Sequence, residues 1–132
     1  MRPFAAVCLV LLALACNSPT DPTDVDLTGR WTGNLGDRHP ANEDWTSVTI
    51  DLTENGNELT GQLRERNGRV HPLKGMRAGS GATLDVTDIP TLGDPACMNI
   101  SLSFSRIETN AIRGSLSGRC YGTILSQFVL TR

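Results

Sequence analysis

The chain has 132 residues, with 14 acidic and 12 basic side chains and a formal net charge of −2. Binding to nucleic acid needs basic side chains gathered on one face, and the sequence shows no such cluster, so nucleic acid is not expected as a partner. The length suffices for one domain with one hydrophobic core.

The chain opens with a minimal basic leader, Met1 and Arg2, followed by the uncharged run FAAVCLVLLALA over residues 4–15. A helix needs about 20 apolar residues to span a bilayer, so this run is too short to cross one. A basic start followed by a short apolar stretch is typical of a secretory signal peptide. We therefore expect residues 1–15 to be a signal peptide.

Small apolar residues precede Cys16, and Ala15 lies where a signal peptidase requires a small side chain. This segment resembles the lipobox of bacterial lipoproteins, although Ala13 replaces the usual leucine three residues before the cysteine. The resemblance implies that Cys16 takes a diacylglycerol and anchors the protein to a membrane of the bacterial cell envelope. Asn17 in the next position implies sorting to the outer membrane. The alternative is an ordinary cleaved signal peptide with an incidental cysteine.

Residues 17–26 (NSPTDPTDVD) combine two prolines, small polar residues and three aspartates. Such a segment cannot bury enough apolar surface to fold, so it is expected to be a solvated tether. The chain then divides into a signal peptide over residues 1–15, a lipidated cysteine with its tether over 16–26, and a folded domain over 27–132.

Two of the four cysteines, Cys97 and Cys120, remain in the folded part once Cys8 and Cys16 are assigned to the leader and the anchor. Outside the cytoplasm we expect them to form one disulfide. The alternative is a pair of free buried thiols. A turn at residues 109–110 would place Cys120 opposite Asn99, so a diagonal bridge or a one-residue bulge would be needed to join the pair.

From residue 27 onward apolar and polar side chains alternate with a period of two, and turn residues interrupt the pattern. A proline at position 72 removes a backbone donor, so the fourth strand is expected to be bulged or frayed there. The expected strands cover approximately 27–35, 48–53, 59–63, 70–76, 82–86, 98–105, 112–116 and 124–130.

The fold class expected from this pattern is all-β, an eight-stranded antiparallel up-and-down β-barrel. A sheet that is apolar on one side must close on itself or fold over, and short sequential turns favour closure. A two-sheet β-sandwich is the alternative, because the connections at 36–44 and 88–96 are long enough for crossovers.

The tripeptide Gly29-Arg30-Trp31 at the start of the first strand resembles the Gly-x-Trp signature of calycins, which include lipocalins and avidins. In that superfamily the tryptophan plugs one barrel end and an arginine near the last strand packs across it. The resemblance implies that Trp31 is the plug and that Arg132 is its partner. Biotin is not expected as a ligand, because the faces assigned inward are almost wholly aliphatic.

Two binding functions follow from a barrel with an apolar inward face. In the first, the barrel is lipocalin-like and binds a small hydrophobic molecule. In the second, the barrel is a packed scaffold for protein contacts or enzyme inhibition in the cell envelope, with Leu73, Leu125 and Val129 on its outer face. The residues expected to line a cavity are Ile50, Leu63, Leu84, Ile100, Leu102, Phe104, Leu116 and Phe128.

No catalytic constellation is visible in the sequence. The two histidines, His39 and His71, lie in separate segments with no third nitrogen or sulfur ligand, so no zinc site is expected. We expect no enzyme activity, no metal and no cofactor.

Overall fold

A computed structural model of the protein describes residues 25–36, 45–88, 97–120 and 123–132. The expected signal peptide, Cys16, His39 and most of the tether lie outside these ranges. Within the described residues, no helix has the length and apolarity needed to cross a membrane.

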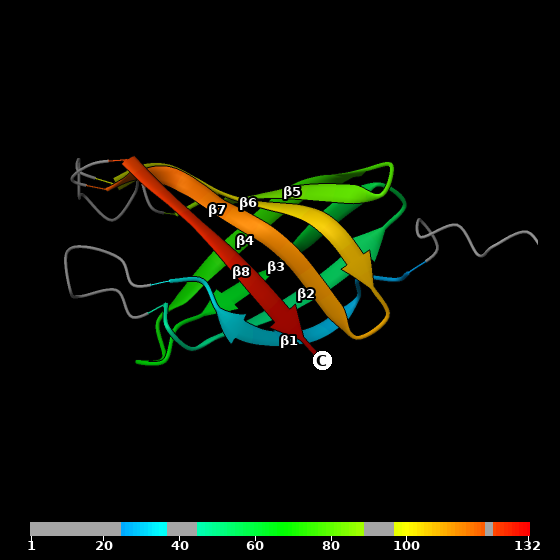
Figure 1. Ribbon diagram of the computed structural model, residues 1–132, viewed down its shortest axis with the longest axis horizontal. Coiled ribbons are helices and arrows are strands. Elements are labelled where there is room, and N and C mark those ends of the chain that lie inside the picture. Colours follow the sequence, from blue (N-terminus) through cyan, green and yellow to red (C-terminus); the bar gives the residue numbers. More distant parts are fainter. Residues whose placement is uncertain (1–24, 37–44, 89–96, 121–122) are drawn as a thin grey trace, which may run out of the picture.

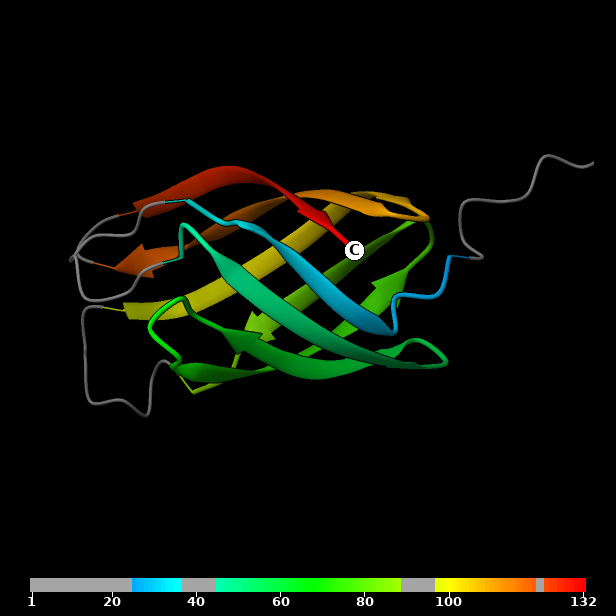
Figure 2. The same ribbon diagram turned by 90° about the horizontal axis from the view of Figure 1, so that it is seen from below.

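Eight antiparallel strands form a closed barrel in which each strand is hydrogen-bonded to its neighbours in sequence order (Figures 1 and 2). The predicted up-and-down barrel is therefore confirmed, and the sandwich alternative is wrong. The strands are β1 Gly29–Asn34, β2 Val48–Asn55, β3 Glu58–Arg64, β4 Val70–Ala78, β5 Gly81–Val86, β6 Cys97–Glu108, β7 Ala111–Cys120 and β8 Thr123–Thr131.

The two ends of the barrel differ in their connections (Figure 1). At one end, which we call the hairpin end, two-residue turns join β2 to β3, β4 to β5 and β6 to β7. Gly56 and Gly79 begin two of these turns with φ angles of 61° and 58°, a conformation that glycine adopts without strain. The other end, which we call the loop end, holds the remaining four connections.

Alternation along the strands places one set of side chains inside the barrel and the other outside. On β2, for example, Val48, Ile50 and Leu52 are buried and the intervening residues are more exposed. The buried apolar residues of all eight strands belong to one hydrophobic cluster, which also contains Leu27, Leu35 and Trp45 from the flanking segments.

The fourth strand departs from the sequence expectation in two ways. Leu73 was expected on the outer face, but it is only 3 % exposed and lies in the core. The strand also runs through Pro72 with no register shift against β3. The carbonyl of Pro72 accepts from the N–H of Thr87, which follows the last residue of β5. Pro72 therefore lies just outside the β4–β5 ladder, where the N–H that proline lacks is not needed.

Two irregularities in β6 set the pairing of the cysteines. The β6–β7 register shifts by one residue between Phe104 and Arg106 and by another between Met98 and Ser101. Within the second shift, Asn99 has a φ of 54°, a left-handed conformation that asparagine tolerates better than most residues. Together the shifts make Cys97 and Cys120 direct backbone partners.

Candidate functional site

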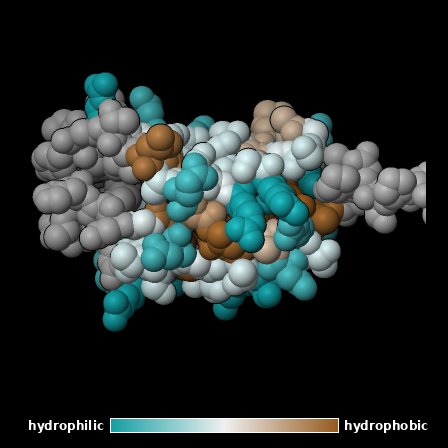
Figure 3. Space-filling view, viewed as in Figure 1, coloured by the Kyte–Doolittle hydropathy of each residue, from teal (hydrophilic) through white to brown (hydrophobic). Residues whose placement is uncertain are grey.

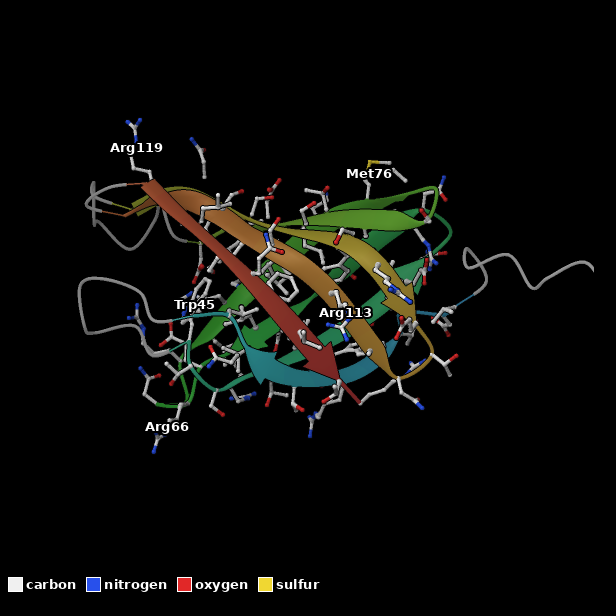
Figure 4. All side chains as sticks on the ribbon, in the orientation of Figure 1. Trp45, Arg66, Met76, Arg113 and Arg119 are labelled. Carbon is white, nitrogen blue, oxygen red and sulfur yellow. The ribbon has the colours of Figure 1, made fainter. Side chains whose placement is uncertain are left out.

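A cluster of buried polar side chains lies at the loop end of the barrel. Its members are Trp45, which precedes β2, Glu65, which follows β3, and His71 on β4. These three residues are 0 %, 2 % and 1 % exposed respectively. Asp88, which follows β5, completes the cluster, and its side chain is 23 % exposed. Figure 4 labels Trp45 at this end.

Glu65 and His71 are the centre of this hydrogen-bond network. The indole N–H of Trp45 donates to Oε1 of Glu65 over 2.8 Å, and Nε2 of His71 lies 2.6 Å from the same oxygen. The second carboxylate oxygen of Glu65 accepts from the side-chain amide of Asn67 over 2.9 Å. On the other side of the imidazole, Nδ1 lies 3.0 and 3.1 Å from the two oxygens of Asp88.

Both ring nitrogens of His71 face a carboxylate oxygen at hydrogen-bond distance, so neither nitrogen is left without a polar neighbour. The ring of His71 is closed to solvent, so we assign the cluster a structural role.

The cluster connects three loops of the loop end. Trp45 also accepts a backbone hydrogen bond from Leu35 through its carbonyl oxygen, over 3.0 Å, which closes the β1–β2 connection. Glu65 begins the turn between β3 and β4, where its N–H donates to the carbonyl of Arg69 over 2.8 Å. Asp88 is the second residue after the end of β5. The network thus joins the segments next to β2, β3 and β5.

The structure brings Trp31 and Arg132 together at the hairpin end. The guanidinium carbon of Arg132 lies 4.5 Å from the centroid of the Trp31 ring, within the range of a cation–π contact. The indole N–H of Trp31 donates to the carbonyl of Leu27 over 2.9 Å, and Nε of Arg132 donates to the carbonyl of Thr109 over 2.7 Å.

A second arginine closes the same end from the β4 side. Nη1 of Arg77 donates to the carbonyl of Val25 over 2.7 Å and to Glu54 over 2.8 Å. Glu54 also accepts from the backbone N–H of Leu27 over 2.8 Å. These contacts fix the segment through which the described chain enters the barrel.

The eight residues expected to line a cavity all lie in the hydrophobic cluster inside the barrel. Their exposed fractions range from 0 % to 4 %, with Phe128 at the upper limit. A side chain that lined a cavity large enough for a water molecule would keep some accessible surface. The low exposed fractions of these eight side chains therefore indicate that they contact one another.

The outer surface carries exposed apolar side chains on two strands. Leu125 and Val129 on β8 are 73 % and 41 % exposed, and Val70 and Met76 on β4 are 37 % and 62 % exposed. The predicted outward positions of Leu125 and Val129 are therefore confirmed. Figure 3 shows hydrophobic side chains beside hydrophilic ones on the face of β7 and β8.

Exposed acidic groups on the same barrel have lowered pKa values. Arg30 donates to both oxygens of Asp51, over 2.8 and 3.2 Å, and this hydrogen bond lowers the pKa of Asp51. The backbone N–H of Thr28 likewise lowers the pKa of Asp26. Both carboxylates contribute to stability above their unfolded-state pKa and lose that contribution as the pH falls. Solvent screening keeps it small.

Sequence reasoning missed the loop-end cluster. Glu65 lies two residues after Leu63, where the predicted third strand ends, and Trp45 precedes the predicted second strand. The inward position of His71 follows from the parity of β4, in which Leu73 also points inward, and the sparse apolar residues of that strand did not fix this parity. Among the described residues, no three His, Cys, Asp or Glu side chains are arranged to hold a metal ion.

Comparison with protein-family models, with curated proteins and with solved structures gave no match for this chain.

Proposed function

We propose that this chain is a lipid-anchored protein of the bacterial cell envelope whose packed barrel makes protein contacts through its outer surface. The observation that carries this proposal is the filled interior. Interior side chains that pack at 0–4 % exposure leave no room for a cargo molecule, so the outer surface is where a partner has access.

A calycin-like origin of the barrel is part of the proposal. Support comes from Gly29-Arg30-Trp31 at the start of β1, and from the contact of Arg132 with the Trp31 ring at the end of β8. The alternative function, a carrier of a small hydrophobic molecule, would require the packed core to separate. That cost grows with the apolar surface exposed, at about 25 cal/mol per Å².

Anchoring through Cys16 would orient the barrel on the membrane. The described chain enters the barrel at Val25, which is held at the hairpin end by Arg77. Eight residues, 17–24, separate Cys16 from Val25. At about 3.3–3.6 Å per extended residue at most, a chain of this length reaches roughly 30 Å. The hairpin end would then stay near the membrane and the loop end would face away from it.

We propose no enzyme activity, metal or cofactor for this function. The histidine that the structure describes, His71, is buried with a carboxylate at each ring nitrogen, so it lacks access to a substrate.

Site-specific photo-cross-linking in cells tests the proposed function. A benzophenone amino acid replaces Leu125 in the full chain, and in a matched control it replaces Met76, which is similarly exposed on β4. We expect an adduct of one discrete mass from position 125 and none from position 76, because β8 carries the proposed contact. Organic extraction of the purified full chain should yield no small molecule in stoichiometric amount.

Three results would contradict the proposal. A stoichiometric apolar molecule in the extract would restore the carrier function. The absence of any adduct at position 125, or an identical adduct pattern at both positions, would show that the face of β8 makes no specific contact.

We also propose the disulfide between Cys97 and Cys120. The two residues are direct partners in an antiparallel ladder, where Cα atoms lie about 4.5–5.5 Å apart, a spacing that a disulfide can bridge.

For a closed loop of about two dozen residues, reduction is expected to lower the free energy of unfolding by about 3 kcal/mol. Urea unfolding with and without reductant measures the loss, and Cys97→Ala/Cys120→Ala should show none on reduction. Both thiols reacting under non-reducing denaturation would refute the bond.

A further inference from the structure

An open groove of about 490 Å³ crosses the outer face of β7 and β8 beside the end of β1. Its volume is within the range of small-ligand and side-chain binding sites. The residues that line it are Asn34, Gly36, Arg113, Gln127, Phe128 and Val129.

A row of directly paired residues runs across this groove. Arg106 on β6 is paired with Arg113 on β7, Arg113 with Val129 on β8, and Val129 with Asn34 on β1. Directly opposed residues of an antiparallel pair project from the same face of the sheet. Two guanidinium groups therefore face outward side by side, an arrangement in which like charges repel.

Only one of these two arginines has a carboxylate partner within the described ranges. Nε of Arg106 lies 2.7 Å from Oε1 of Glu108, whereas Arg113 has no carboxylate within ion-pair distance among those residues. Figure 4 shows Arg113 projecting from β7 beside β8. A carboxylate supplied from outside the chain would pair with Arg113 and relieve its repulsion with Arg106.

The other groups in the groove add donors and an apolar surface. Oδ1 of Asn34 accepts from the backbone N–H of Gly36 over 2.7 Å, and the amide nitrogen of the same side chain is a donor. Gln127 adds a second side-chain amide. Val129 supplies apolar contact, and Leu125 extends this surface along the outward positions of β8.

From this arrangement we infer that the groove binds a glutamate or aspartate side chain on a partner protein segment in which apolar residues flank the acid. The carboxylate pairs with Arg113, and the flanking side chains lie on Val129 and Leu125. This inference rests on the proposed function, in which the outer surface contacts a protein, and it adds the chemistry of the partner segment.

Peptide titration of the full chain, followed by NMR, tests the inference. The probe is the peptide acetyl-Ser-Leu-Glu-Leu-Ser-amide, and its matched control has glutamine in place of glutamate. We expect the glutamate peptide to shift the side-chain amide signals of Asn34 and Gln127, and the glutamine peptide to bind about tenfold more weakly, since it loses the charge-assisted pair.

Two variants assign the binding to the groove. Arg113→Gln should weaken binding of the glutamate peptide about tenfold, whereas Arg119→Gln, which removes the same charge at the other end of β7, should leave it unchanged. Equal binding of both peptides, equal effects of both variants, or shifts confined to residues outside the groove would overturn the inference. Displacement of the peptide by vesicles of phosphatidylcholine with one quarter phosphatidylglycerol would also overturn it, in favour of a lipid-facing groove.

The peptide titration and the cross-linking experiment fail independently. Adducts at position 125 without peptide binding would overturn the acidic-segment inference and leave the packed scaffold in place. Peptide binding without adducts at position 125 would support the groove and contradict the proposed cellular contact.

Discussion

Replacement of Glu65 by alanine is expected to lower the free energy of unfolding by about 3–5 kcal/mol, because it removes the central acceptor of a buried hydrogen-bond network. The substitution removes the acceptor of the Trp45 indole N–H and one of the two carboxylates beside His71. Both groups are buried, so water does not replace the lost hydrogen bonds without opening the loop end. Urea unfolding followed by tryptophan fluorescence measures the loss.

The matched control for Glu65 is Glu58→Ala at the opposite end of β3. Glu58 lies at the start of β3, its side chain is 56 % exposed, and its distance to Nζ of Lys74 is 3.8 Å. An exposed pair of this kind contributes at most about 1 kcal/mol. If the two variants differed by less than the experimental error, the loop-end cluster would have no special role in stability.

Trp31→Ala is the second variant with a large expected effect, again about 3–5 kcal/mol, because a fully buried aromatic side chain leaves a cavity when it is truncated. The same change removes the hydrogen bond to the carbonyl of Leu27 and the surface on which Arg132 lies. The hairpin end should therefore become the least protected part of the barrel in amide hydrogen exchange.

A double-mutant cycle separates the arginine contact from the packing of the tryptophan. Arg132→Ala alone is expected to cost about 0.5–1 kcal/mol, the size of an exposed cation–π contact. In the Trp31→Ala background the same substitution should cost less, because the cation–π contact is already lost and only the hydrogen bond from Arg132 to the carbonyl of Thr109 remains to be removed. A cost of Arg132→Ala that is unchanged by the loss of Trp31 would show that the arginine does not act through the ring.

The closed barrel was predictable from the sequence because its local rules agree with one another. Strict alternation on β2, β5 and most of β6 assigns the inward side chains, and residues such as Ile50, Leu84 and Leu102 are buried as expected. Short turns such as Gly56 and Asn57 force neighbouring strands to pair in sequence order. An up-and-down meander then needs only the β1–β8 ladder to close.

The features that escaped prediction depend on tertiary context. In β4 the apolar residues are sparse, so the pattern did not fix which side of the strand faces inward. Leu73 was therefore expected on the outer face, and His71 was considered only as a zinc ligand, whereas both side chains are buried. The two register shifts of β6 have no clear local signal, because neither Asn99 nor Ser105 is a glycine. Glu65 reads as a loop charge until its neighbours Trp45 and His71 are placed in space.

Xenon titration of the full chain, followed through methyl NMR signals, tests most directly whether the barrel interior is filled. Empty apolar cavities of sufficient size bind xenon, so a cavity would produce saturable shifts of the methyl groups around it. We predict only weak, non-saturating shifts for Leu63, Leu84, Leu102 and Leu116, each of which is 0 % exposed. Saturable shifts shared by these methyl groups would demonstrate a cavity and contradict a packed barrel that works through its outer surface.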